Sequence, residues 1–159
     1  MLLKLDTAPR RMKLVFDLTT EIRQNPRTME LAQALTLNRD KPLMGLKGTH
    51  GLYGSEEWWS NIRNGTMKTK IVSGVIDGTY FAGQDSRWGD QVNSFKLKLD
   101  DGNTVEESIY CHARTDQKLF KPGAVIMVAY AFDELKNQPT RDGSVNYSKV
   151  VLEMAVSTD

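Results

Sequence analysis

The sequence has few of the residues that catalytic and metal sites usually need. Its 159 residues include one cysteine, Cys111, and two histidines, His50 and His112. A single thiol cannot form an internal disulfide, so the fold does not depend on an oxidising compartment. The spacings H-x-x-x-H and C-x-x-C are both missing, which argues against zinc. We therefore expect a protein that is not an enzyme and that binds no metal and no cofactor.

Long apolar runs and an excess of one charge are also missing. Charged residues such as Lys4, Asp6 and Arg10 interrupt the first apolar stretch, which is unlike a signal peptide. No window approaches the ~20 apolar residues that span a bilayer. The 21 basic and 20 acidic residues give a net charge of +1, which argues against an extended basic surface for nucleic acid. We expect a cytoplasmic protein with no membrane partner.

The residues that resemble catalytic groups have simpler explanations. Cys111 and His112 are adjacent, and neighbours on a strand point to opposite faces, so they are not expected to form a nucleophilic dyad. General acid–base chemistry needs a desolvated carboxyl group, and nothing in the sequence indicates one. We interpret the paired acids as solvated residues, with a turn and a helix start explaining two of the pairs: Glu56-Glu57, Asp100-Asp101, Glu106-Glu107 and Asp133-Glu134.

The pattern of the chain changes near residue 66. Residues 1–66 contain a short strand at 12–18, a short helix at 19–24 and two further helix starts. One start has Asn25 as cap and Pro26 at the first helical position, and the other has Ser55 as cap. Residues 1–66 hold ten bases and seven acids, whereas residues 67–159 hold eleven bases and thirteen acids. We therefore expect an N-terminal helical arm (1–66) and a separate β domain (67–159).

Residues 67–159 consist mainly of alternating apolar and polar residues, which is typical of half-buried strands. Glycines in the first strand indicate a bend or a bulge, and Asp101-Gly102 predicts a tight hairpin turn. We predict five strands, at 70–82, 93–100, 104–112, 124–132 and 149–157. The predicted core residues are Phe95, Leu97, Leu99, Val125, Met127, Leu152 and Met154.

This order of strands resembles the OB-fold, a five-stranded barrel whose second and third strands often form a binding face. The first strand is long and bent, the next two form a hairpin, and residues 113–120 leave room for a short helix before the apolar fourth strand. We therefore expect a mainly β protein, a β-barrel with an N-terminal helical arm. An OB-like barrel is favoured, and an SH3-like barrel or a small sandwich is the alternative.

Aromatic side chains and lysines on the predicted surface indicate that the protein acts by binding. Interfaces favour aromatic anchors, so protein–protein contacts or self-association come first. Single-stranded nucleic acid on the barrel face is the alternative, because OB-folds combine stacking rings with basic residues. The residues that we expect to bind are Lys96, Lys98, Tyr110, Trp88, Arg87, Trp59 and Tyr53.

Glycines recur every third residue from Gly45 to Gly54, directly before the helix that begins near Ser55. Glycine-rich loops before a helix can hold phosphate through backbone N–H groups, and Lys47, Thr49 and His50 would add donors. The segment matches neither the Walker pattern nor the dinucleotide fingerprint. We favour a connector that packs on the β domain and keep a small phosphate-ligand site as a second alternative.

Overall fold

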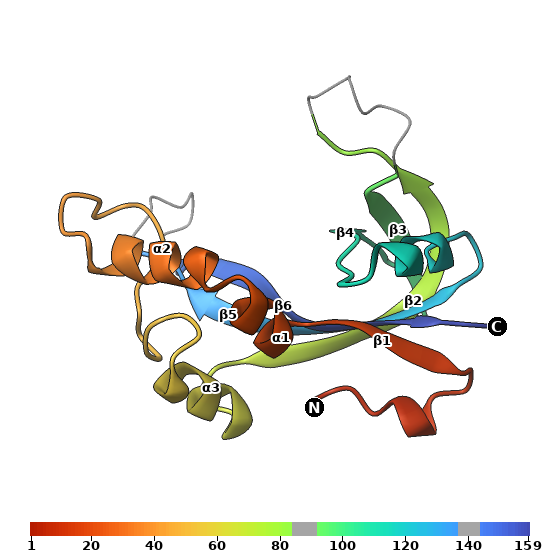
Figure 1. The fold of residues 1–159 in the computed structure, drawn as a ribbon, viewed down its shortest axis with the longest axis horizontal. Coiled ribbons are helices and arrows are strands. Elements are labelled where there is room, and N and C mark those ends of the chain that lie inside the picture. Colours follow the sequence, from red (N-terminus) through yellow and green to blue (C-terminus); the bar gives the residue numbers. More distant parts are fainter. Residues whose placement is uncertain (84–91, 137–143) are drawn as a thin grey trace. The chain divides into compact units, whose positions relative to one another are not determined.

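The computed structural model describes residues 1–83, 92–136 and 144–159 of the chain. Strands predominate, and three α-helices and two described 3-10 helices accompany them (Figure 1). In chain order the elements are η1 (Leu5–Thr7), β1 (Met12–Asp17), α1 (Leu18–Gln24), α2 (Pro26–Leu37), α3 (Glu56–Arg63), β2 (Thr69–Tyr80), β3 (Ser94–Leu99), β4 (Thr104–Ser108), η3 (Arg114–Leu119), β5 (Val125–Glu134) and β6 (Tyr147–Ser157).

All six strands form one antiparallel sheet in the order β1-β6-β5-β2-β3-β4. Among the described strands β1 and β4 each pair on one side only, so the sheet is not closed into a barrel. One backbone hydrogen bond, from His112 N to Val15 O at 2.9 Å, joins the segment after β4 to β1. The prediction of a mainly β protein is confirmed. The OB-like barrel is not confirmed, because β1 adds a sixth strand and the sheet stays open.

The described residues belong to two compact units. Unit 1 consists of Met1–Asp17, Ile71–Ala129 and Glu153–Asp159, and unit 2 consists of Leu18–Lys70 and Tyr130–Leu152. Strands β2, β5 and β6 therefore contribute residues to both units. The division into an arm and a β domain at residue 66 stays a prediction.

The predicted register of the hairpin strands is correct at its centre. Phe95 and Leu97 of β3 are buried, as are Leu152 and Met154 of β6. Leu97 pairs with Ile76 of β2, which is also buried. Phe95, Leu97, Leu152 and Met154 were predicted as core, and for these four the prediction is confirmed.

Three predicted core residues lie only half-buried: Leu99, Val125 and Met127. In the first half of β5, Ile126 and Val128 are buried and point to the opposite face from Val125 and Met127, whereas Ala129, Tyr130 and Ala131 are all buried further along the strand. The prediction therefore chose the wrong face of β5. Its sequence is apolar on both faces, so the alternation of polar and apolar residues gives no guide there.

Glycines in β2 have two different roles. The pairing of β2 with β3 shifts register between Ile76 and Gly78, so a bulge is present where the sequence predicted a bend or a bulge. A Cβ at Gly74 would lie 2.5 Å from the Lys98 carbonyl oxygen, so only glycine fits there. Both glycines allow the long strand to follow β3.

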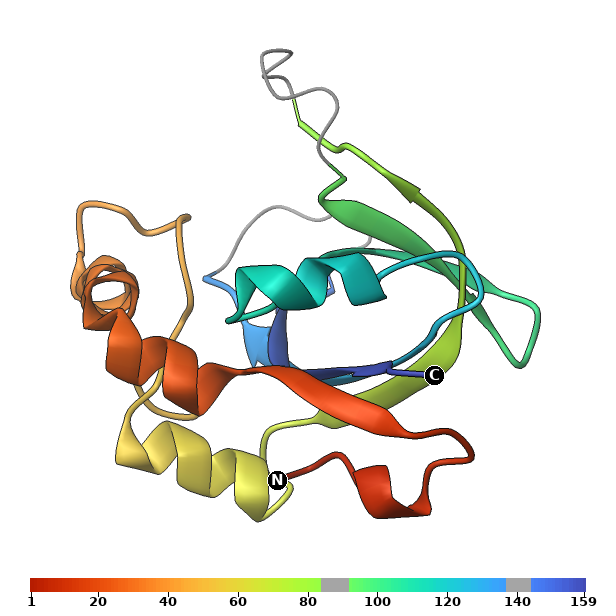
Figure 2. The same ribbon diagram turned by 45° about the vertical axis from the view of Figure 1, so that its right-hand side comes forward.

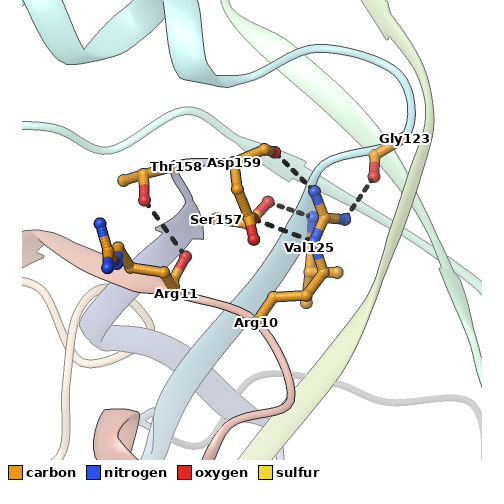
Figure 3. A network of polar contacts seen from close by, with 7 residues as sticks. All are labelled: Arg10, Arg11, Gly123, Val125, Ser157, Thr158 and Asp159. Carbon is orange, nitrogen blue, oxygen red and sulfur yellow. Dashed lines mark hydrogen bonds and ion pairs between the residues drawn. The ribbon is translucent and has the colours of Figure 1, made fainter.

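Polar contacts join the two ends of the chain within unit 1 (Figure 3). The Arg10 guanidinium donates to Asp159 Oδ1 at 3.2 Å, to Asp159 O at 2.6 Å and to Gly123 O at 3.0 Å. Nearby, the Val125 amide donates to Ser157 Oγ at 2.9 Å. The side chains of this ion pair stay in contact with solvent, Arg10 at 34% and Asp159 at 59% exposure.

A second, buried contact holds the first residues of the chain. The Glu153 carboxylate on β6 accepts hydrogen bonds from Leu2 N at 2.8 Å and from Leu3 N at 2.8 Å. Both Glu153 and the Leu3 side chain are buried. A buried carboxylate is tolerated where backbone donors satisfy it, so this contact is expected to stabilise unit 1 more than the exposed Arg10 pair.

Candidate protein-binding surface

Helix α2 begins as the sequence predicted but buries none of its residues. Pro26 occupies the first turn, where its missing N–H costs nothing. Asn25 precedes it, although its side chain makes no capping hydrogen bond. All twelve residues of α2 are at least partly exposed. An isolated helix of this length is marginal in water, so contacts at its edges and its end must hold it.

The glycine-rich loop supplies one set of those contacts. The segment after α2 turns back along the helix (Figures 1 and 2). A Cβ at Gly45 would lie 2.8 Å from Leu35 of α2, and a Cβ at Gly54 would lie 2.7 Å from Met29 Sδ. Positive φ angles, between 77° and 97°, are found at all four glycines of the loop: Gly45, Gly48, Gly51 and Gly54. The period of three thus reflects backbone conformation and close approach to α2.

Lys136 supplies the second set, at the C-terminal end of α2. Its ammonium group donates to Leu35 O at 2.6 Å, to Lys41 O at 2.9 Å and to Asn38 O at 3.2 Å. Each of these carbonyls also accepts a backbone hydrogen bond, so the ammonium is a second donor to each. A cation at this end also complements the helix dipole. Lys136 therefore fixes both the last turn of α2 and the start of the following loop.

The α2 segment and the loop after it expose several large apolar side chains to solvent. Four of the ten large apolar side chains that are exposed in the described residues lie within residues 31–44. They are Leu31, Leu37, Leu43 and Met44, each at least 51% exposed. Single exposed leucines are ordinary, but a group of them on one short segment is typical of an interaction site.

Basic residues accompany these apolar side chains. Residues 23–47 hold five bases and two acids, a net charge of +3. Within the described part of the chain, Arg39 and Lys41 make no side-chain hydrogen bond or ion pair, whereas Lys47 Nζ lies 3.4 Å from Glu134 Oε1. A hollow of about 370 Å³ is lined by Thr36, Asn38, Arg39, Pro42, Lys47 and Lys136. We call Leu31, Leu37, Leu43, Met44, Arg39, Lys41 and Lys47 the α2 surface.

Behind the loop, unit 2 contains a buried carboxyl group that the sequence analysis interpreted as solvated. Asp133 is fully buried, and its Oδ2 accepts a hydrogen bond from Trp58 Nε1 at 2.8 Å. Among the described residues its Oδ1 has no hydrogen-bond partner. Burial raises the pKa of Asp133, while the Trp58 hydrogen bond and the nearby His50 oppose that shift. The solvated interpretation of Asp133 is therefore wrong.

Glu134 occupies the donors that were expected to bind phosphate. Thr49 Oγ1 donates to Glu134 Oε2 at 2.7 Å, and Lys47 Nζ is near the other oxygen. The Thr49 hydrogen bond, helped by Lys47, lowers the pKa of Glu134 below its usual value. A carboxylate already at this position would repel a phosphate, so the geometry gives the phosphate alternative no support.

Three of the predicted binding residues lie in unit 1 and contact different groups. Lys96 and Lys98 point outward from β3, as predicted, and Lys96 Nζ is 4.0 Å from Glu106 Oε1. Tyr110 instead packs its ring 5.2 Å from Phe16 of β1. The nucleic-acid alternative is not confirmed, and the binding role of these three residues stays a prediction.

Tyr53 and Trp59 lie in unit 2, on either side of Trp58. Their ring centroids are 5.1 Å and 4.9 Å from that of Trp58, which is fully buried. Ser55 Oγ accepts from Trp58 N at 3.2 Å, which confirms the predicted cap. Both aromatic residues are half-buried, so they cover Trp58 more than they face solvent. The other two predicted residues, Arg87 and Trp88, lie outside the described residues.

Cys111 has the environment of an unreactive thiol. It is half-buried, and burial, together with the nearby Asp116, raises its pKa. The adjacent His112 does not use its Nε2 to activate this thiol, because that nitrogen accepts a hydrogen bond from Asp17 N at 3.1 Å. The described residues contain no group of three histidines, cysteines or acids placed to hold a metal ion.

The fold and this surface define a mainly β protein with an exposed, partly apolar helix and a cationic loop, features typical of proteins that bind other proteins. Residues 12–157 match the family described as immunity protein RhsI2, so the chain belongs to the RhsI2 immunity protein family. Among curated proteins, no relative matches the sequence. Membership fits a protein-binding role and an inhibitor rather than an enzyme. No helix in the described residues has the length and apolar character needed to cross a membrane.

Proposed function

We propose that the chain inhibits a toxin protein by binding to it directly. Membership of the RhsI2 immunity protein family over residues 12–157 carries this proposal. Inhibition by binding needs a complementary surface and no catalytic group, and the exposed side chains of the α2 surface meet that need. The inhibitor is expected to act as a stoichiometric partner, so its protection should depend on how much of it is present.

The test uses a toxin protein sought among the products of the genes next to the one that encodes this chain, and recognised because it kills the host when produced alone. A bacterial host produces that toxin with the full chain, with an immunity protein of another family, or alone. We expect growth only with the full chain. The purified proteins should form a complex whose mass, measured by light scattering, equals a defined sum of the two. A toxin that kills equally well with and without the chain, and that forms no complex with it, contradicts the proposal.

A further inference from the structure

We propose that the α2 surface is the part of this chain that docks the toxin, and that the toxin surface it fits carries carboxylates around an apolar centre. This inference rests on the proposed function, and it adds which residues make the contact and which chemistry they select. Its three supports are the lack of burial in α2, the grouped apolar side chains and the excess of positive charge.

The first support is that α2 differs from its neighbours in burial. Helix α1 buries Leu18, and α3 buries Trp58 and Ile62, whereas α2 buries nothing. Its inner side is held by backbone contacts to the glycine loop and by the Lys136 ammonium, so its outer side chains are left for other contacts. A helix that offers apolar side chains to a groove is a common mode of protein recognition.

The second support is the chemistry at the end of the helix. Leu37 is 66% exposed, and Leu43 and Met44 follow it in the loop beside Arg39 and Lys41. Exposed aliphatic side chains with charged residues close to them in sequence are the residue types that an interface combines in its apolar centre and polar rim. Contact with another protein would remove these apolar side chains from water, which favours binding.

The third support is charge, which selects the partner. Arg39 and Lys41 flank the exposed Asp40 and have no ion-pair partner among the described residues, so a net positive charge remains for whatever approaches. The Lys136 ammonium adds a positive charge, although carbonyl groups already take its hydrogen bonds. Complementary charges steer association and exclude wrong partners, so this surface selects an acidic one.

The same features argue against two other occupants. A second copy of the chain docked through the same surface would bring these cations together, because a two-fold contact places each patch against itself. Proteins that bind single-stranded nucleic acid use aromatic side chains for stacking, next to a row of basic side chains. The α2 surface offers leucines and a methionine in place of the aromatic rings. An acidic protein surface fits both the leucines and the charges.

The first experiment reverses the two cations that have no partner. The double variant Arg39→Glu with Lys41→Glu is compared with Lys96→Glu with Lys98→Glu, which makes the same change of charge on β3. We expect the first to bind the toxin about tenfold or more weakly at low salt, and to lose most of the salt dependence seen with the unaltered chain. The second should keep its affinity within about twofold, because those lysines lie outside the proposed contact.

The second experiment tests the apolar centre. Leu37→Ala with Leu43→Ala is compared with Ile71→Thr and Val75→Thr, which alter exposed apolar residues of β2. We expect about a tenfold or greater loss of affinity for the leucine variant only, because hot spots concentrate in the centre of an interface. Amide hydrogens of residues 26–37 should also exchange more slowly in the complex than in the free chain. Circular dichroism on heating checks that every variant is folded.

The outcomes separate the two proposals. If the unaltered chain does not bind the toxin, the proposed function fails and this inference fails with it. If the unaltered chain binds and both α2 variants bind equally well, this surface is wrong while the proposed function stands. Self-association or binding of single-stranded DNA that the α2 variants abolish would also overturn the inference, because another occupant would then use the surface.

Discussion

Asp133 is expected to make the stability of the protein depend on pH in an unusual direction. Burial raises its pKa in the folded chain, so the folded state holds the proton more tightly than the unfolded state does. Its contribution to the free energy of unfolding therefore falls as pH rises from the unfolded pKa through the folded one. The variant Asp133→Asn lacks this titration and can still accept the Trp58 hydrogen bond. Its stability relative to the unaltered chain should increase with pH over that range, measured by urea unfolding.

Glu134→Gln is the matched control at the neighbouring position. The pKa of Glu134 is lowered by the Thr49 hydroxyl and by Lys47, so its stabilising effect is present above the unfolded pKa and is lost as pH falls through the folded one. This variant should lose stability relative to the unaltered chain as pH rises. Equal pH profiles for the two variants would contradict the assignment of the raised pKa to Asp133.

Gly54 is expected to tolerate alanine poorly because two costs combine there. Its φ is 77°, and a Cβ would lie 2.7 Å from Met29 Sδ. Gly65 has a similar φ of 81° with nothing within 4 Å of its Cβ position, so it isolates the backbone cost. We expect Gly65→Ala to lower the free energy of unfolding by about 1–2 kcal/mol, and Gly54→Ala by about 1–3 kcal/mol more. Equal losses of unfolding free energy for the two variants would show that close packing against Met29 of α2 adds no cost at Gly54.

For single residues, the sequence predicted roles that depend on near neighbours in the chain, but not contacts with residues far away in the sequence. The Ser55 cap and the outward Lys96 and Lys98 depend on local pattern, and they were predicted correctly. Asp133 was misinterpreted because its donor, Trp58, is distant in sequence and because β5 continues to Glu134 rather than ending near residue 132. A charged residue at the end of an apolar run does not reveal whether the strand buries it.

Helix α2 depends on a side chain from another part of unit 2, which sets its local stability. Replacing Lys136 by Met keeps its apolar stem and removes three hydrogen bonds to the end of the helix. We expect a loss of about 1–3 kcal/mol, mainly from the partly buried hydrogen bond to Leu35 O, since a hydrogen bond from a charged group is worth about that much. Amide exchange should accelerate in residues 26–37.

Lys70→Met is the matched control for this prediction. Lys70 is exposed and makes no side-chain hydrogen bond or ion pair within the described residues. Its variant should leave amide exchange in α2 unchanged. If Lys136→Met also leaves that exchange unchanged, the ammonium does not hold the helix.

Helices and strands were predicted more accurately than the faces they bury. Pro26 and Asn25 located α2, and the short helix and short strand before it are present as α1 and β1. These signals depend on local backbone preferences. The buried face of β5 could not be predicted, because its neighbours on both sides of the sheet decide which side chains water can reach.

Over the whole chain, the two contacts that hold its ends should differ in strength because they differ in burial. Glu153→Ala leaves the Leu2 and Leu3 amides without their carboxylate, and we expect a loss of about 1–3 kcal/mol in the free energy of unfolding. Arg10→Ala breaks an exposed ion pair, with an expected loss below about 1 kcal/mol. Urea unfolding of both variants provides the comparison. A larger loss for Arg10→Ala would contradict the ranking.

The architecture of the whole sheet was predicted only in part. Residues 12–18 were recognised as a strand but assigned to an arm, whereas β1 joins β6 in the same sheet. A local pattern predicts a strand but does not specify which distant strand it pairs with, and closure of a sheet depends on that pairing. The open edges at β1 and β4 could not be derived from the sequence for this reason.

Leu31 and Leu37 of α2 are mostly exposed, so the surface proposed for recognition overlaps little with the contacts that hold the described residues together. Residues such as Leu31 and Leu37 can be exchanged at little cost in stability, because the glycine loop and Lys136 fix the helix from its other side and its end. A library randomised at these positions would therefore keep its fold while sampling new partners. On the proposed function, the same scaffold offers a starting point for redesigning which toxin the chain binds.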